Sequence, residues 1–245
     1  MSELARMLKT YKIDIAFVID ATGSMGPFID KFKTEVFEMP YRLKCAFEKV
    51  DRKVESMRIK IIDFGDYKYD GCDAIHQTRF FDAENEIDEI VDAVNDIQYE
   101  RRGGDIPDNG LEALYEAMAS DWVDAKPNGR HIIVLVTDAP PLDLGERADC
   151  IGYDKDKYPR TLDELDEAWA PTDLPFNPKL KINPLKSCLF LFAPKDTIEG
   201  RSWDKIAKWE RVIPSSVEPG KGFGFSIVDD LCYAIPFVRY NFNVI

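Results

Sequence analysis

Two strand-length runs constrain the fold of this chain more than any other feature. Residues 13–20 (IDIAFVID) and 132–138 (IIVLVTD) are apolar almost throughout and do not alternate with polar residues, a pattern typical of strands buried on both faces of a parallel sheet. Segments with apolar residues at helical spacing separate these and similar runs. The sequence therefore predicts an α/β fold with a doubly wound, mostly parallel sheet and helices on both faces.

The same two periodicities predict the other elements. Strands are expected over residues 12–20, 56–64, 130–138, 186–194 and 209–216, with a short edge strand over 77–81. Helices are expected over residues 28–50, 83–98, 111–123, 161–169 and 202–209, with a closing helix within 225–245. Pro40 should kink or divide the first helix and Pro236 should interrupt the last, because proline removes a backbone hydrogen bond. Thr161 and Glu164 have the spacing of a capping box.

The length of the chain bounds the number of domains. A chain of 245 residues fits one large α/β domain with a substantial core. No repeat, low-complexity tract or linker divides it, so we expect a single domain over residues 1–245. Residues 142–186 are rich in Asp, Lys, Pro and Tyr, and we interpret them as an insertion at the carboxyl edge of the sheet.

Acidic residues dominate the charge of the chain. The formal net charge is −13, and such a field repels nucleic acid and anionic lipid. The first twelve residues, MSELARMLKTYK, lack the apolar core of a signal peptide, and no apolar run approaches the ~20 residues of a membrane helix. The five cysteines form no CxxC pair, which argues against a zinc site or a disulfide framework. We expect a cytoplasmic protein that binds neither nucleic acid nor membrane.

Oxygen-bearing side chains follow the two buried runs. Asp20, Thr22 and Ser24 come after the first run, and Asp138 ends the second. The carboxyl ends of parallel strands form the crevice in which open α/β sheets bind ligands, so these side chains should lie together. Carboxylate and hydroxyl oxygens without imidazole or thiolate suit Mg²⁺ or Mn²⁺ better than zinc. The sequence therefore points to a site for a hard divalent cation.

Separated motifs of the chain resemble those of von Willebrand factor A domains. DATGSM (residues 20–25) looks like the DxSxS motif of that family, with Thr22 in place of the first serine. VTDAPP (136–141) resembles the later strand that brings the second metal-site aspartate. GGDIPDNGLEAL (103–114) is similar to the glycine-rich loop that opens a helix, and IIDFGDY (61–67) resembles the second strand and its turn. The motifs occur in the family's order.

The resemblance implies a metal-ion-dependent adhesion site. Carried over by position, the metal ligands would be Asp20, Thr22, Ser24, Asp105 and Asp138. In such sites the cation keeps an open position that accepts an acidic side chain of a partner protein, so the family consists mostly of binding modules and not of enzymes. Intracellular relatives commonly act as scaffolds for ATPases, kinases or phosphatases. The resemblance thus implies Mg²⁺-dependent (or Mn²⁺-dependent) protein binding, with partner specificity in the insertion.

Asp105 departs from the family pattern, because the glycine-rich loop usually supplies a threonine at this position. If Asp20, Asp105 and Asp138 all ionise, three negative charges outweigh one divalent cation. We expect such a site to hold metal more firmly and to attract a partner's carboxylate less than the threonine version. The structural alternative is that Asp105 caps the helix that begins near Pro107.

Two rival interpretations stay open at the level of sequence. DATGS also looks like the DKTGT motif of haloacid-dehalogenase-like phosphotransferases, in which the aspartate, here Asp20, attacks phosphate. Ala21 replaces the lysine of that motif, and the later acidic motif follows the polar stretch DIQYERRGG instead of a buried strand. Alternatively, Thr22 and Ser24 merely cap the next helix.

Ordinary structural roles are expected for other polar residues near these motifs. We expect Asp63 and Asp66 in a solvated turn. Asp108 should be a first-turn acid favoured by the helix dipole, close enough to the site to support it. His76 and His131 should occupy surface positions or positions with satisfied hydrogen bonds.

Overall fold

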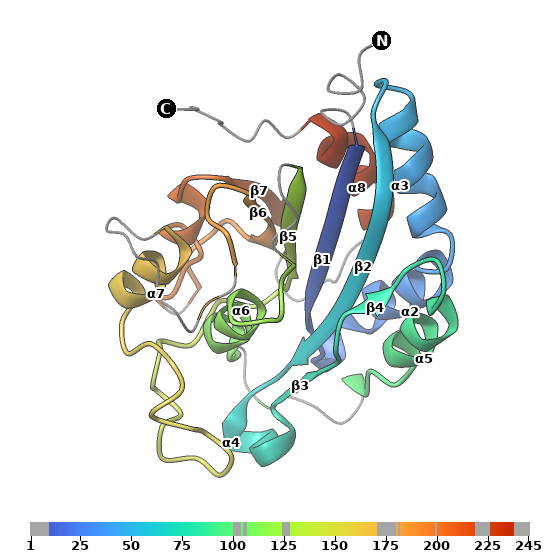
Figure 1. The fold of residues 1–245 in the computed structure, drawn as a ribbon. Helices are drawn as coiled ribbons and strands as arrows, with labels where there is room; N and C mark the ends of the chain where they lie inside the picture. The colour runs from blue at the N-terminus through green and yellow to red at the C-terminus, as the bar shows by residue number, and fades with distance from the viewer. Residues whose placement is uncertain are drawn as a thin grey trace.

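A seven-stranded sheet forms the centre of the molecule (Figure 1). The computed structural model describes residues 10–99, 104, 107–123, 128–170, 180, 182–198, 200–218 and 226–237. In these residues the strands are β1 (Thr10–Asp20), β2 (Lys53–Phe64), β3 (Ile75–Gln77), β4 (Phe81–Asp82), β5 (Gly129–Val136), β6 (Ser187–Pro194) and β7 (Val212–Val217). Their order is β3-β2-β1-β5-β6-β7, and β4 also pairs with β2. Of the strands in the described residues, only β3 and β4 pair antiparallel, so the predicted mostly parallel sheet is confirmed.

Helices cover both faces of this sheet. The α-helices of the described residues are α2 (Gly26–Glu35), α3 (Met39–Glu48), α4 (Tyr67–Asp70), α5 (Ile87–Asn95), α6 (Gly110–Met118), α7 (Leu162–Trp169) and α8 (Ile227–Ala234). Shorter 3₁₀ turns are η1 (Gly23–Met25), η2 (Gly71–Asp73), η4 (Ile206–Lys208) and η5 (Ile235–Phe237). One core cluster joins α2, α3, α5 and α8 to the sheet, and a second joins α6, α7 and η4 to its other face. Phe17 and Val18, adjacent in β1, pack into different clusters, which explains why this strand is apolar on both sides.

The structure bears out the effects predicted for Pro40, Thr161 and Pro236. The helix predicted over residues 28–50 is divided into α2 and α3, and Pro40 lies in the first turn of α3, where its missing N–H is not needed. The Thr161 hydroxyl caps α7 by accepting a hydrogen bond from the Glu164 amide at 3.1 Å. In the closing segment α8 gives way to η5, which contains Pro236, and residues 238–245 lie outside the described part.

Two predicted elements are wrong because individual side chains override the pattern. The edge strand over residues 77–81 is replaced by β3 and β4, since the Thr78 hydroxyl accepts the Ile61 amide at 3.0 Å and interrupts the ladder. The helix over residues 202–209 is only the turn η4. Trp203 and Ile206 are buried in the second core cluster, and the Trp203 indole donates to the carbonyl of Ala139 at 3.0 Å. A segment this short follows such anchors more than its helical period.

Two helices are shorter than predicted. The Asp82 carboxylate accepts the amides of Glu84 and Asn85, which forms a side-chain turn and delays α5 to Ile87. After α6, the Ser120 hydroxyl donates to the carbonyl of Glu116 at 2.9 Å. Both ends are therefore set by local hydrogen bonds that compete with the helix.

The connection between β5 and β6 is bonded to the body of the fold. Arg147 donates two hydrogen bonds to Asp66, both at 2.6 Å, and the Tyr158 hydroxyl donates to Glu116 at 2.8 Å. The acceptor carboxylates are buried, so the connection lies over the core instead of extending from it. That residues 142–186 are an insertion within a single domain of residues 1–245 stays a prediction.

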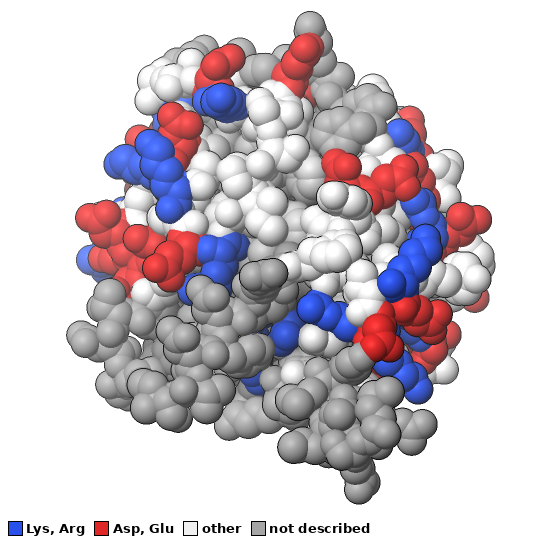
Figure 2. Space-filling view, turned by 90° about the horizontal axis from the view of Figure 1, so that it is seen from above, with Lys and Arg blue, Asp and Glu red and all other residues white. Residues whose placement is uncertain are grey.

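Among the described residues, acidic side chains are not concentrated at the end of the molecule from which β1 starts. Figure 2 views that end, and among the described residues acidic and basic side chains lie interspersed around an area of other residues. No helix in the described part of the chain is long and apolar enough to cross a membrane.

Candidate metal centre

Asp20 ends β1 and is fully buried. The parallel register pairs Ile19 with Val136, so the next residues, Asp20 and Thr137, come together at the carboxyl ends of β1 and β5. The Thr137 hydroxyl donates to one carboxylate oxygen of Asp20 at 2.6 Å. The backbone amide and hydroxyl of Thr22 donate to the other oxygen, at 2.9 and 2.7 Å. Groups from two strand ends therefore hold both oxygens.

Ser24 connects the first loop to the second. Its hydroxyl donates to Asp138 at 2.9 Å, across 114 residues of sequence, and lies 3.5 Å from the hydroxyl of Thr22. Asp138 is buried, whereas Ser24 is exposed. The structure thus gathers Asp20, Thr22, Ser24 and Asp138 into one cluster with Ser24 at its open side.

Burial dominates the electrostatics of this cluster. The pKa of Asp20 is raised to about 6, against 3.8 for an ordinary aspartate, chiefly by burial, and the charge of Asp138 acts in the same direction. Hydrogen bonds from Thr137 and Thr22 act in the opposite direction. Among the described residues, no basic side chain is one of the groups that act on Asp20. A buried carboxylate beside a second carboxylate binds a cation, whether a proton or a metal ion, more readily than an isolated one.

The donor set fits a hard divalent cation. Carboxylate and hydroxyl oxygens are the side-chain ligands that Mg²⁺ and Mn²⁺ prefer. Asp105, the remaining predicted ligand, lies outside the described residues. Among the residues that are described, no group of three or more His, Cys, Asp or Glu side chains is arranged for a metal ion. Within this part of the chain, a metal site therefore depends on Asp20 and Asp138 together with the hydroxyls of Thr22 and Ser24.

The turn before α6 is bonded to both neighbouring loops. Asp108 is buried; its amide donates to the carbonyl of Pro140 at 3.4 Å, and its carbonyl accepts the Leu142 amide at 2.9 Å. The amide of Asn109 donates to the carbonyl of Gly65 at 3.0 Å. Asp108 therefore lies against the loop that follows Asp138, where it can support the site.

The prediction of a solvated turn for Asp63 and Asp66 is wrong. Asp66 has no exposed surface, pairs with Arg147 and also accepts the Lys68 amide at 2.8 Å to cap α4. Asp63 is 3% exposed, and one of its oxygens lies 3.1 Å from Nδ1 of His76. Arg147 makes the burial of Asp66 possible by supplying an opposite charge from 81 residues away, which no local pattern signals.

Both histidines occupy the ordinary positions predicted for them. His131 is buried; its Nδ1 accepts the amide of Asn183 at 3.0 Å, and its Nε2 lies 3.0 Å from the carbonyl of Val123. Because Nδ1 accepts this hydrogen bond, the ring proton is on Nε2, which donates to the Val123 carbonyl. The side chain of His76 is 64% exposed.

Thr137 is the site residue that sequence reasoning missed. Besides donating to Asp20, its hydroxyl accepts the amide of Ala139 at 3.0 Å. The available signal was its place just before Asp138 at a strand end. That signal becomes specific only when β5 is known to lie beside β1.

Comparisons with known proteins agree with this architecture. Residues 14–166 match the von Willebrand factor type A domain. The α-protein kinase vwkA of Dictyostelium discoideum is 27% identical over 131 residues, which cover 52% of this chain and 18% of the kinase. The pilus adhesin SpaC of Lactobacillus rhamnosus GG, in its open conformation, superposes with a TM-score of 0.54 at 14% identity over 92% of this chain and 30% of the adhesin. This chain therefore spans less than a third of either protein, and the adhesin supports the fold alone. The match over residues 14–166 shows that the chain belongs to the von Willebrand factor type A domain family.

Proposed function

We propose that this domain is a protein-binding module that holds Mg²⁺, or Mn²⁺ in its place, and binds its partner through the cation. Asp20, Thr22, Ser24 and Asp138 would hold the ion, with Asp105 as the further ligand that the family resemblance implies. The observation that carries the proposal is the buried Asp20 carboxylate, on which the charge of the neighbouring Asp138 acts. A divalent cation would offset both the burial of Asp20 and the repulsion between the two carboxylates.

The open side of the cluster is where a partner would approach. Ser24 is exposed there, while Asp20 and Asp138 lie buried behind it. When bound, the cation supplies a coordination position for a carboxylate of the partner. Because Asp105 adds a third negative charge to the set, we propose firm metal binding with a weakened attraction for the partner's acid.

The relatives bear on the kind of partner. The Dictyostelium protein is named as a kinase, and this chain matches only 18% of it. We propose that the present domain binds and does not catalyse, and that its partner is a cytoplasmic ATPase, kinase or phosphatase, as the family resemblance implies. Its five cysteines are all free thiols, which is typical of proteins in a reducing compartment.

The phosphotransferase alternative receives less support from the geometry. A nucleophilic aspartate needs an oxygen that can reach phosphorus. Asp20 has no exposed surface, and hydrogen bonds from Thr22 and Thr137 occupy both of its oxygens. A nucleophile must bond phosphorus directly, whereas an aspartate can hold Mg²⁺ through a water molecule, so this environment favours a ligand role.

Calorimetric titration with MgCl₂ and MnCl₂ tests metal binding. We expect saturable binding by the wild type at pH 7.5 and its loss in Asp20→Ala and Ser24→Ala. Asp88→Ala, which removes an exposed carboxylate of α5, is the matched control and should bind as the wild type does. Circular dichroism checks that each variant is folded. A wild type that binds neither ion would contradict the proposal.

Partner capture from cell extract with Mg²⁺ and with EDTA tests the second part of the proposal. Capture should require the divalent cation and should fail for Ser24→Ala. Capture that persists in EDTA would place the partner surface elsewhere on the domain.

A further inference from the structure

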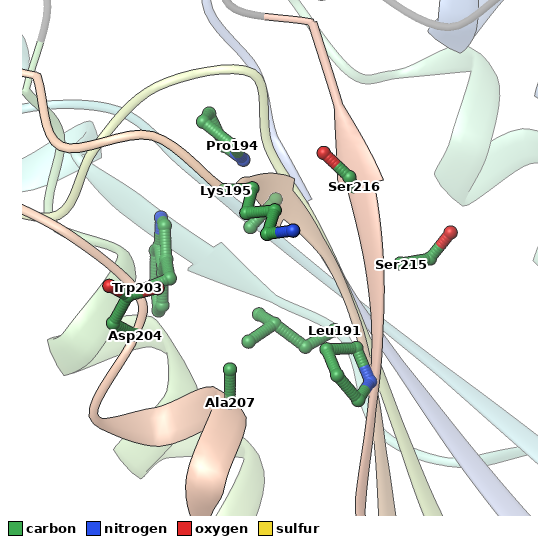
Figure 3. Close-up of a pocket in the computed structure, with 10 residues that line it drawn as sticks. Leu191, Pro194, Lys195, Trp203, Asp204, Ala207, Ser215 and Ser216 are labelled. Atoms are coloured by element: carbon green, nitrogen blue, oxygen red, sulfur yellow. The ribbon is translucent and has the colours of Figure 1, made fainter.

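A second candidate binding site lies at the carboxyl ends of β6 and β7 (Figure 3). It is a groove of about 310 Å³, within the size range of small ligand sites. Leu191 of β6 forms its floor, Trp203 and Ala207 form one wall, and β7 forms the other. Ala193 of β6 also lines it. The face of the sheet that α6 and α7 cover elsewhere is thus left open at this corner.

Strand register determines which side chains of β7 face the groove. Leu191 pairs with Pro214 and Ala193 with Ser216, and paired residues of parallel strands point to the same face. Ser216 therefore faces the groove, while the intervening Ser215 points to the other side of β7, as Figure 3 shows. Strand β7 therefore contributes the apolar ring of Pro214 and one hydroxyl, that of Ser216, to the groove.

Lys195 gives the groove a positive charge. It directly follows the end of β6, and its ammonium extends over the floor toward β7 (Figure 3). In the described part of the chain Lys195 forms no ion pair. The carboxylate of Asp204, on the opposite wall, is turned away from the floor. An anionic group that enters beside apolar surface would therefore meet an ammonium that no described carboxylate pairs with.

Pairing of a partner's strand with the edge of β7 is disfavoured. The Leu189 amide donates to the carbonyl of Arg211, so the alternation of a parallel ladder directs the backbone nitrogen of Pro214 away from β6. Proline has no N–H to offer an added strand there. A ligand is thus expected to enter the groove with a side chain and not to pair along the whole strand.

We propose that the groove binds the C-terminal residue of a protein partner, with its apolar side chain on Leu191 and its carboxylate on Lys195 and Ser216. Successive side chains of an extended peptide point to opposite faces, so an apolar residue and a neighbouring Asp or Glu cannot both enter one pocket. A C-terminal apolar residue carries both groups on one Cα atom. Capture of a terminal carboxylate is a common mode of peptide recognition.

This site does not depend on the proposed metal function. The indole of Trp203 donates to Ala139, the neighbour of Asp138, so the groove and the metal centre lie along the same edge of the sheet. None of the groups that face the groove is a proposed metal ligand. Binding in the groove should therefore persist in EDTA, and its failure would leave the metal proposal untouched.

A titration of the ¹⁵N-labelled full chain with N-acetyl-L-phenylalanine, in EDTA at pH 7, tests the proposal. The probe should shift the indole N–H signal of Trp203, and N-acetyl-L-phenylalaninamide should bind about tenfold more weakly because it lacks the charge. Lys195→Met should abolish the preference for the acid, and Lys195→Arg should keep it. Lys205→Met is the matched control, because Lys205 lines a separate pocket beside Pro141, and it should bind as the wild type does.

Three results would overturn the proposal. The first is an unchanged Trp203 signal, and the second is equal affinity for the acid and the amide. The third is failure of the tripeptide acetyl-Gly-Ser-Phe to bind when N-acetyl-L-phenylalanine does, which would make the groove a small-molecule pocket. If the groove accepts the end of a chain, the tripeptide should bind at least as well as the single residue. Dispersed spectra of each variant establish that it is folded.

Discussion

Replacing Asp20 by asparagine should stabilise the metal-free domain above pH 6. In the folded protein the pKa of Asp20 is raised to about 6, mainly by burial, against 3.8 for an ordinary aspartate. The folded state therefore takes up this proton more readily than the unfolded chain, so stability falls as the pH rises from about 4 to 6 and then stays level. A shift of about 2 pKa units corresponds to about 3 kcal/mol, which the neutral amide avoids.

The hydrogen bonds around Asp20 allow this substitution without repacking. An asparagine oxygen can keep both bonds from Thr22. The Thr137 hydroxyl can turn to donate to the carbonyl of Ala139, 3.3 Å away, and then accept from the new amide. The stability change should thus report the charge and not a lost contact.

Urea unfolding in EDTA, followed by tryptophan fluorescence between pH 4 and 8, measures this effect. The stability difference between Asp20→Asn and the wild type should grow by about 2–3 kcal/mol over that range. The control, Asp88→Asn, removes an exposed charge on α5 and should show no such growth. A difference that stays constant or shrinks as the pH rises would refute the reasoning.

Four further substitutions test other parts of the structure. Thr137→Val removes the donor to Asp20 and should destabilise the fold by about 1–3 kcal/mol. It should also raise the pKa of Asp20, which the pH dependence of the carboxyl ¹³C chemical shift measures. A pKa equal to that of the wild type would contradict the assigned contact. Arg147→Met leaves Asp66 buried without its partner and should lower the free energy of unfolding in urea by about 3–5 kcal/mol. The double variant Asp66→Asn/Arg147→Met should recover much of this loss. If it recovers none, the broken ion pair is not the cause. Trp169→Ala, at a fully buried side chain whose indole donates to the backbone carbonyl of Glu210, should lower the free energy of unfolding in urea by about 3–5 kcal/mol, and Trp169→Phe by less. Asp105→Thr should strengthen binding of an acidic peptide in Mg²⁺ and weaken Mg²⁺ binding by calorimetry; unchanged or lower peptide affinity would refute the charge argument.

The elements that could be predicted from sequence are those whose signal lies within a few residues. β1 and β5 are apolar on both faces because helices cover both sides of the sheet, and the pattern itself shows this. The positions of Asp20 and Asp138 at strand ends follow directly from those patterns. The general rule that ligands bind at the carboxyl ends of parallel strands then predicts that these two carboxylates lie close together.

Features that depend on contacts between distant segments could not be predicted. The role of Thr137 depends on the register between two strands 117 residues apart. The burial of Asp66 depends on Arg147, which lies in the connection between β5 and β6. The segment around Trp203 has a helical period but is anchored to Ala139 and forms only a short turn. In each case one long-range contact outweighs a local preference, because a buried polar group must be satisfied wherever its partner lies.

Backbone hydrogen bonds join the described segments around the candidate metal centre. The amide of Ala21 donates to the carbonyl of Phe64, that of Asn109 to Gly65, and that of Leu142 to Asp108. Bonds of this kind restrict the movement of these segments, which lowers the entropic cost of holding an ion between them. Metal affinity should therefore depend mainly on charge: on the protonation of Asp20 and on whether Asp105 adds a third carboxylate. Substitutions that change charge at these two positions should alter affinity more than substitutions that loosen the loops.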